Sequence, residues 1–334
     1  MPTAPLYRRF NINSLQAIAS VEETQPQFST GELHVHVQAP TQLRPATRSS
    51  ARVLLRACRP RQWSKNLLVL AAPAAAGVID RPLVAAQVAG AFMALCLVSS
   101  ATYLVNDVRD RHQDRLHPRK RTRPVAAGEI SPRAALQIAL VLAIVGIASA
   151  TAITPGLGLV AIGYLALTGS YSLWWRRVVV LDILAIAAGF ALRALAGGVA
   201  TDIYLSRWFV LVTAFCAIYL VAAKRLAELR DGASSGAVRA TLRRYSLGNL
   251  RLVLAVSAAG GGIAYVSWAV TRPAHLVWYV LSVVPFLLWL GRYAALIGAG
   301  AGQAPEELIL RDRTLLALSI LWSFLFLSGV YAGH

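Results

Sequence analysis

Nine apolar runs follow one another between residues 67 and 331, and they constrain the fold more than any other feature. They cover residues 67–79, 83–105, 134–153, 157–173, 178–200, 208–223, 252–270, 275–291 and 314–331. A helix that crosses a bilayer needs about 20 apolar residues and must satisfy its backbone polar groups internally. The first run is short when it is counted from Leu67, and including Trp63 as an interfacial anchor brings it closer to that length. The sequence therefore predicts an all-α polytopic membrane protein with about nine transmembrane helices.

The composition favours a membrane protein over a soluble one. The 334 residues are 57% hydrophobic and 14% charged, with a mean hydropathy of +0.56, whereas soluble domains carry about 25% charged residues. The formal net charge is +18, but the arginines cluster between apolar runs, where they meet anionic head groups or phosphates. We therefore expect no nucleic-acid partner. The cysteines form no ligand pattern and indicate no disulfide; they are Cys58, Cys96 and Cys216.

The charges between the apolar runs predict the orientation in the membrane. Twenty Lys and Arg residues lie in four intervals, 106–133, 174–177, 224–251 and 292–313. The connections between these intervals hold only Arg81, Arg207 and Arg272. By the positive-inside rule the four intervals and the N-terminal tail are cytoplasmic. We expect a multi-pass protein of the inner (plasma) membrane, with a flexible cytoplasmic extension over residues 1–50 and a transmembrane domain over residues 51–334.

The most informative polar stretch, Asn106 to Asp114, follows the second apolar run. On a helix, Asp107, Asp110 and Asp114 fall at positions i, i+3 and i+7, and Asn106 precedes Asp110 by four residues. This spacing puts three carboxylates and an amide on one face within about two turns. Like charges so close repel one another unless a cation lies among them, and hard oxygen ligands suit Mg²⁺. We expect these four residues to bind Mg²⁺. The alternative is a solvated acidic face that is salt-bridged to Arg109, Arg111 and Arg115.

A cationic segment follows from Arg115 to Pro124 and includes Lys120, Arg121 and Arg123. A polyphosphate substrate needs such a combination, because the metal bridges phosphate oxygens and Lys and Arg neutralise the remaining charge. A positive-inside anchor would explain the arginines but not the adjacent acidic residues. We therefore expect a Mg²⁺-bound diphosphate to depart at the cytoplasmic membrane surface. The sequence has no G-x-x-x-x-G-K-[ST], H-E-x-x-H or G-x-S-x-G motif.

Ionisable residues elsewhere are further candidates. Arg193 lies well inside the run 178–200, where an ionisable side chain is costly and marks a functional site by default, although it can instead satisfy helix-end carbonyls or snorkel. Asp182 precedes it by three helical turns, about 16 Å, so the two side chains cannot pair. We expect both to face an aqueous cavity. Lys224 and Glu228 form an i,i+4 pair, which either stabilises a helix or binds a phosphate or metal.

Several segments together resemble UbiA-type intramembrane prenyltransferases. The pattern N-D-x-x-D-x-x-x-D, followed by D-R-x-H-P-x-K-R-x-R-P over residues 114–124, is similar to the first Asp-rich motif of that superfamily. Four other elements resemble one branch, the decaprenyl-phosphate phosphoribosyltransferases: R-P-x-Q-W-x-K-N at 59–66, Tyr171-Ser172, R-A-x-A-G at 193–197 and K-R-x-x-E-L at 224–229. The resemblance covers about residues 52–331.

The resemblance implies a fold, an enzyme activity and two substrates. The fold is nine transmembrane helices around a central cavity that is open laterally to lipid. The activity is Mg²⁺-dependent transfer of 5-phosphoribosyl from phosphoribosyl pyrophosphate to a polyprenyl (decaprenyl) phosphate, with release of pyrophosphate. This reaction is an early step toward the arabinose donor for the arabinogalactan of a bacterial cell wall. A homo-oligomer is compatible with these features.

The resemblance and the chemistry together assign roles to individual residues. The acidic face holds Mg²⁺, and Asp107, Asp110 and Asp114 are the expected catalytic residues. Lys120, Arg121 and Arg123 are expected to cradle the diphosphate leaving group. The other expected substrate ligands are Lys224, Arg225 and Glu228 for the ribose 5-phosphate or its hydroxyls, Arg61 and Lys65 for the lipid phosphate, Tyr171 for a phosphate, and Arg193 for a site within the membrane.

The chain also departs from the superfamily pattern. Members that handle prenyl diphosphates usually show a second D-x-x-x-D-type motif in the later cytoplasmic loop, where this chain has only Glu228 and Asp231. This difference argues for one main metal cluster. Relatives often place a Lys after Tyr-Ser, whereas this chain continues with Trp174-Trp175-Arg176-Arg177. Two alternative functions are prenyl transfer from a polyprenyl diphosphate to an aromatic acceptor, and transport of phosphorylated metabolites. Transport would explain Arg193 but not the three-carboxylate face.

Overall fold

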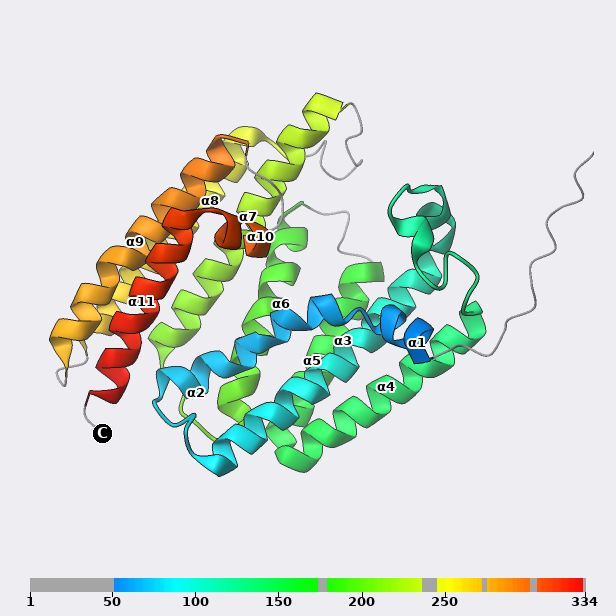
Figure 1. The fold of residues 1–334 in the computed structure, drawn as a ribbon, viewed down its shortest axis with the longest axis horizontal. Coiled ribbons are helices and arrows are strands. Elements are labelled where there is room, and N and C mark those ends of the chain that lie inside the picture. The colour runs from blue at the N-terminus through cyan, green and yellow to red at the C-terminus, as the bar shows by residue number, and fades with distance from the viewer. Residues whose placement is uncertain (1–50, 174–178, 236–244, 272–274, 301–304, 333–334) are drawn as a thin grey trace, which may run out of the picture. The chain divides into compact units, whose positions relative to one another are not determined.

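The computed structural model describes residues 51–173, 179–235, 245–271, 275–300 and 305–332. Within these ranges every regular element is a helix (Figure 1). The α-helices are α1 (Ala51–Cys58), α2 (Ala71–Ala75), α3 (Pro82–Leu116), α4 (Pro132–Ile153), α5 (Pro155–Leu173), α6 (Val179–Ala200), α7 (Arg207–Ser235), α8 (Leu247–Val270), α9 (Leu276–Gly298), α10 (Pro305–Arg311) and α11 (Arg313–Tyr331). Two 3₁₀ helices, η2 (Pro60–Leu70) and η3 (Lys120–Thr122), complete the set. The predicted all-α class is confirmed, whereas the predicted extension over residues 1–50 and the pair Arg176-Arg177 lie outside the described residues.

Seven of the described helices are long and apolar enough to cross a membrane, namely α3, α4, α6, α7, α8, α9 and α11. Each overlaps one of the predicted apolar runs, and α5 coincides with the run 157–173. Local signals set their boundaries. Pro82 and Pro132 occupy first-turn positions, where a missing N–H costs little. Before α4, the Ser131 hydroxyl accepts a hydrogen bond from the Ala134 N–H at 3.2 Å.

The first predicted span, 67–79, is not one regular α-helix in the structure. Residues 60–70 form η2 and residues 71–75 form the short α2. Pro73 cannot donate a backbone hydrogen bond and crowds the preceding turn. Contact with α6 also fixes this segment, because a Cβ on Gly197 would lie 1.8 Å from the Val69 carbonyl oxygen. Glycine therefore lets the backbone of η2 lie directly on α6.

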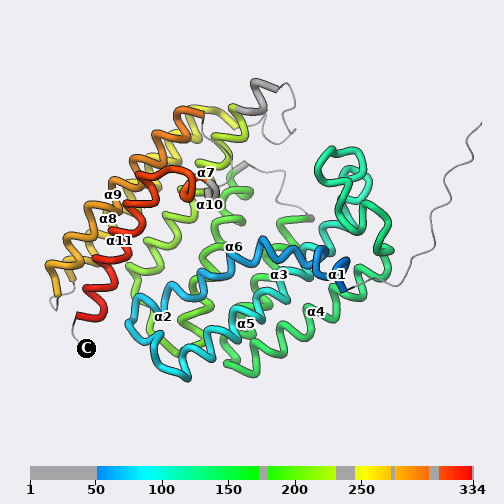
Figure 2. The backbone as a smooth tube through the Cα atoms, viewed as in Figure 1, coloured from blue at the N-terminus to red at the C-terminus, as the bar shows by residue number. Residues whose placement is uncertain are grey.

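Two groups of helices meet along α6 (Figure 2). On one side, η2, α3 and α5 pack with α6 around a buried cluster that includes Leu95, Leu157 and Ala196. On the other side, α7, α8, α9 and α11 pack around a cluster that includes Tyr219 and Tyr293, to which α6 contributes Ile183. This arrangement brings the ends of α3, α5, α6 and α7 into contact through polar side chains, and the candidate site lies there.

Candidate active site

The acidic face lies in the last turns of α3, and two of its carboxylates are buried. Residues 106–114 all belong to α3. Asp107 and Asp114 are each 2% exposed and lie on the same helix face, as their spacing predicts. Asp110 and Asn106 are partly buried. A buried carboxylate must be compensated by a cation or by hydrogen bonds, so the surroundings of the first two decide what this face does.

Three cations from outside α3 surround the buried carboxylates. Arg59 donates to Asp107. Arg123 Nη1 lies 3.2 Å from Asp107 Oδ1 and 2.6 Å from Asp114 Oδ2, so that it bridges the two side chains. Lys120 Nζ lies 4.0 Å from Asp114 Oδ1. The three cations are themselves 23–28% exposed, so the cluster opens toward solvent on its basic side.

This pattern differs from the solvated acidic face that the sequence left open as an alternative. The partners expected for such a face donate instead to backbone carbonyl oxygens: Arg109 to Ser172, Arg111 to Val108 and Arg115 to Ala126. The contact from Arg109 ties α3 to the end of α5. The carboxylates are therefore paired with arginines from distant segments, which is typical of a site that binds charged ligands.

Arg59 reaches Asp107 from an unusual backbone conformation. Its φ of 54° lies in the left-handed region, which costs a non-glycine residue on the order of 1 kcal/mol or more and is concentrated at functional sites. The preceding carbonyl, on Cys58, accepts a 3.2 Å bond from Trp63 Nε1, which fixes the turn. The guanidinium lies 5.2 Å from the ring centre of Tyr103. Burial lowers the pKa of Arg59, and the charge of Asp107 opposes that shift.

The basic loop after α3 is shaped by contacts from α1. Arg56 donates to the Thr122 carbonyl at 2.7 Å and pairs with Glu129 at 3.1 Å. These contacts hold the loop so that Lys120, in η3, and Arg123 face the buried carboxylates. Arg121, between them, is exposed. The predicted group of three cations is therefore divided, with two side chains on the acidic pair and one at the surface.

The donor set of the acidic face fits a hard divalent cation. Mg²⁺ is usually held by one or two carboxylates together with water and substrate phosphates, and Asp107 and Asp114 are two carboxylates close enough to share the Arg123 guanidinium. Among the described residues no three His, Cys, Asp or Glu side chains gather around one point. The ligands would therefore be this pair, supplemented by Asp110 and Asn106, and Arg59 and Arg123 would have to yield part of their contact.

A cavity of about 190 Å³ lies beside the acidic face, between η2, α3, α5 and α6. Four of the predicted site residues line it: Lys65, Asn106, Tyr171 and Arg193. Arg193 faces this cavity, as expected. Lys65 Nζ donates to Gln62 at 2.6 Å, and Arg61, on the same 3₁₀ helix, is exposed. The structure thus joins residues from four separate predicted segments in one place.

Asp182 is not among the residues that line the polar cavity, and it is the acceptor of a buried network. Its carboxylate accepts from the hydroxyls of Tyr171 at 2.7 Å and Tyr245 at 2.8 Å. It also accepts from Arg225 Nε at 2.7 Å and Nη2 at 3.0 Å. Arg225 Nη1 in turn lies 2.6 Å from Glu228. All three guanidinium nitrogens of Arg225 are therefore engaged by protein carboxylates, and the network joins α5, α6, α7 and Tyr245, two residues before α8.

The part of the chain that begins at Lys224 is consequently arranged differently from the sequence expectation. Glu228 pairs with Arg225 rather than with Lys224, which is exposed on α7. Burial, together with the bond to Asp182, raises the pKa of the Tyr245 hydroxyl, which keeps it a proton donor. Of the residues expected to bind the ribose 5-phosphate, Lys224 is the one whose charge is not neutralised by an ion pair among the described residues.

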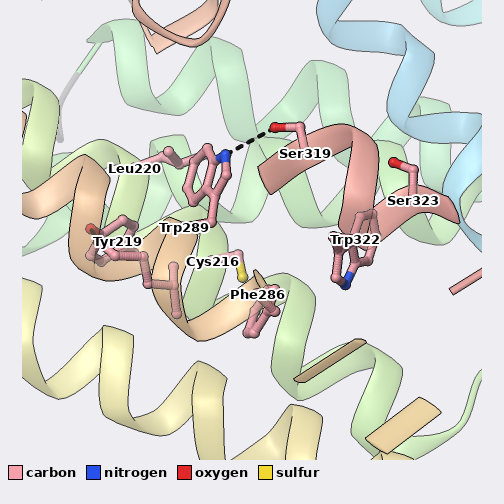
Figure 3. Close-up of a pocket in the computed structure, with 9 residues that line it drawn as sticks. Cys216, Tyr219, Leu220, Phe286, Trp289, Ser319, Trp322 and Ser323 are labelled. Atoms are coloured by element: carbon pink, nitrogen blue, oxygen red, sulfur yellow. Dashed lines mark hydrogen bonds between the residues drawn. The ribbon is translucent and has the colours of Figure 1, made fainter. Parts of the chain in front are cut away.

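A second cavity, of about 280 Å³, lies between α7, α9 and α11 (Figure 3). Its walls are aromatic and aliphatic, with Tyr219, Phe286, Trp289 and Trp322 as the large side chains. The Trp289 indole N–H donates to Ser319 at 3.0 Å, as the dashed line in Figure 3 marks. No charged residue lines this cavity. It is suited to hydrocarbon and belongs to different helices from the polar cavity.

Several residues of the site were not identified from the sequence. Arg59 was part of a recognised segment but had no role, and Asn66, Tyr103, Tyr164 and Tyr245 had none. Tyr103 and Tyr164 lie within apolar runs, where a tyrosine carries a weak signal because it often serves packing alone. Asn66 and Tyr245 lie outside such runs and match no chemical motif. Arg59 directly precedes a proline in a charged segment, and only that position could have drawn attention to it.

The UbiA prenyltransferase family model matches residues 67–330. A decaprenyl-phosphate phosphoribosyltransferase from Mycobacterium tuberculosis is 42% identical over 275 residues, which cover 80% of this chain and 91% of the relative. A decaprenyl-phosphate phosphoribosyltransferase from Corynebacterium glutamicum is 39% identical over 313 residues, which cover 91% of this chain and 94% of the relative.

Solved structures show the same fold. A UbiA homolog from Archaeoglobus fulgidus bound to DMAPP and Mg²⁺ matches with a TM-score of 0.64 and 19% identity, covering 84% of this chain and 98% of that chain. The structure of the same homolog bound to GPP and Mg²⁺ matches with a TM-score of 0.62 over the same shares of the two chains. At this identity the likeness concerns the helical architecture alone.

Proposed function

We propose that this chain, which belongs to the UbiA prenyltransferase family, transfers 5-phosphoribosyl from phosphoribosyl pyrophosphate to a polyprenyl phosphate and releases pyrophosphate. The relatives named for transfer to decaprenyl phosphate are 39–42% identical over most of both chains. The observation in the structure that carries the proposal is the buried pair Asp107 and Asp114, bridged by Arg123 beside the polar cavity.

The reaction replaces one C–O bond at ribose C1 by another. An oxygen of the lipid phosphate forms a bond to C1, while the bond from C1 to the diphosphate oxygen breaks and its electron pair leaves with pyrophosphate. A phosphate monoester is largely ionised at neutral pH, since its second pKa is about 6, so no general base is required. The protein must therefore stabilise the leaving diphosphate and align the attacking phosphate.

Residues of α3 and of the basic loop stabilise the leaving group. Arg123 and Lys120 lie over the acidic pair and would donate to the diphosphate oxygens, with the exposed Arg121 at the rim. Mg²⁺ held by Asp107 and Asp114, with Asp110 and Asn106, would supply further neutralisation of the phosphate charge. Arg123 donates to both carboxylates in the structure, and a bound diphosphate offers it an alternative acceptor of the same charge type.

The lipid phosphate is assigned to η2. Arg61 is exposed on this element and Lys65 lines the polar cavity, so the two bracket the approach from the membrane to C1. By the positive-inside rule, the protein would lie in the inner membrane with this end of the helices on the cytoplasmic side. The product would then serve as a precursor of the arabinan of a cell wall.

The proposal is tested with purified protein, Mg²⁺ and two alternative substrate pairs. Phosphoribosyl pyrophosphate with a polyprenyl phosphate should release pyrophosphate and give a phosphoribosylated lipid, whereas a polyprenyl diphosphate with an aromatic acceptor should give no prenylated product. The opposite result would assign aromatic prenyl transfer instead. Uptake of a phosphorylated metabolite into vesicles that is unchanged in Asp110→Asn, without turnover of either pair, would assign transport.

A further inference from the structure

Arg193 is a buried cation without a carboxylate partner among the described residues. Its side chain is 6% exposed in the middle of α6, and no ion pair within the described ranges involves it. A buried charge is costly unless it is compensated, and inside a membrane the cost is larger still. By contrast, Arg225, whose side chain is 11% exposed, has two carboxylate partners. The missing counter-charge is therefore a property of Arg193 that needs an explanation.

Neutral groups from three helices hold the Arg193 guanidinium in place. Its Nε donates to Asn66 Oδ1 at 2.8 Å, Nη1 to the Gly189 carbonyl at 2.8 Å, and Nη2 to the Tyr164 hydroxyl at 2.5 Å. The guanidinium also lies 4.6 Å from the Tyr164 ring centre. Asn66 is itself fixed, because its amide nitrogen lies 3.3 Å from Ser99 Oγ. The cation is oriented but not neutralised, because all three of these acceptors are uncharged.

The polar cavity connects this guanidinium to the acidic face. Arg193 and Asn106 both line it. Tyr103 lines it as well and contacts two cations: Arg59 lies over its ring at 5.2 Å, and its hydroxyl interacts with Arg193. One side chain therefore links Arg193 with Arg59, which donates to Asp107 on the acidic face.

The lining between these two ends suits a sugar. Six residues with hydroxyl groups line the cavity: Thr102, Tyr103, Tyr164, Thr168, Tyr171 and Ser172. Several of these hydroxyls already have partners within the protein, such as Tyr171 with Asp182, but a hydroxyl oxygen has two acceptor lone pairs and can also accept from a sugar hydroxyl. The apolar cavity between α7, α9 and α11 offers a hydrocarbon chain a better environment. Arg225, which the sequence suggested for the ribose phosphate, already has both of its charge partners within the protein.

We propose that Arg193 forms a phosphate-monoester subsite and binds the 5-phosphate of the phosphoribosyl donor, with Asn66 and Tyr164 as positioning residues for its guanidinium. The inference rests on the proposed function, in that it names which end of the donor enters the membrane-embedded part of the site. The diphosphate stays at Asp107, Asp114 and the basic loop. The phosphate supplies the negative charge that no carboxylate among the described residues supplies to Arg193.

The test measures ligand binding without turnover, as the shift of the apparent unfolding temperature of the full chain in nanodiscs. For the wild type, ribose 5-phosphate should bind and ribose should not. In Arg193→Met the affinity for ribose 5-phosphate should fall by about tenfold to a hundredfold, the value of one or two charge-assisted hydrogen bonds. The affinity for Mg²⁺ pyrophosphate and for farnesyl phosphate should change by less than about twofold. Arg193→Lys, which keeps the charge but loses the planar fork, should be intermediate.

Arg207→Met is the matched control, because Arg207 is exposed, packs on Trp208 at 4.9 Å and does not line the cavity. It should bind all probes as the wild type does. The inference is overturned if the wild type responds equally to ribose and ribose 5-phosphate, a comparison that needs no variant. It is also overturned if Arg193→Met loses farnesyl phosphate instead, which would make Arg193 a lipid-phosphate ligand. Absence of turnover in the wild type with every polyprenyl phosphate would refute the proposed function, and these binding results would still stand by themselves.

Discussion

Replacing Asp107 by asparagine removes a negative charge that two guanidinium groups share. Asp107 is 2% exposed and accepts from Arg59 and Arg123, which are 23% and 27% exposed. Losing one partner of a fully buried ion pair costs about 3–5 kcal/mol. Arg59 can rehydrate in part, and Arg123 keeps its contact with Asp114. We therefore expect a loss of unfolding free energy below that range, about 2 kcal/mol. For a domain of this size that change corresponds to roughly 3–4 °C in the unfolding temperature.

The effect of Asp107→Asn on turnover should be larger than its effect on stability. A carboxylate that holds the metal and orients Arg123 acts on the transition state, where the loss of one electrostatic contact costs about a hundredfold to a thousandfold in kcat. The assay is pyrophosphate release at saturating substrates, alongside fluorescence-detected unfolding in the same detergent. Asp312→Asn is the matched control, because it makes the same chemical change in an ion pair with Arg292, and Asp312 does not line the polar cavity. Activity of Asp107→Asn within twofold of the wild type would refute the reasoning.

Four further predictions follow from single contacts. Gly197→Ala should destabilise the protein by about 3 kcal/mol or more, since its Cβ would lie 1.8 Å from the Val69 carbonyl oxygen. Gly163→Ala is the control: its Cβ would meet nothing within 4 Å, so it should be neutral or stabilising in the same unfolding assay. Asp182→Asn should lower stability by about 3 kcal/mol, because it removes the charge that Arg225 shares; an unchanged unfolding temperature would contradict this. Removal of Mg²⁺ by a chelator should abolish pyrophosphate release, and adding Mg²⁺ back should restore it. The hydrogen bond from the Arg292 guanidinium lowers the pKa of Asp312. Ionised Asp312 should therefore stabilise the fold fully above about pH 4, and this contribution should be lost as the pH falls further. In Asp312→Asn, the unfolding temperature should fall less steeply with decreasing pH in this range.

The helices and their registers were largely determined by the sequence. Apolar runs of sufficient length can be satisfied in lipid only as helices, so the run 134–153 became α4 (132–153) and the run 178–200 became α6 (179–200). The spacing of Asp107 and Asp114 likewise placed them on one face, because helical periodicity is a local property. The same reasoning did not predict that residues 60–75 combine a 3₁₀ helix with a short α-helix, where Pro73 and the contact with Gly197 shape the backbone.

The partners of the polar side chains were decided only by the tertiary structure. Asn66 and Arg193 are 127 positions apart in the sequence, and Asp182 meets Tyr245 across 63. Their contacts depend on which helices pack together and at which depth, and many helix arrangements bury the same apolar runs equally well. The sequence therefore determined where charge lies along each helix. Packing decided which buried charges are compensated within the protein, as at Arg225, and which are not, as at Arg193.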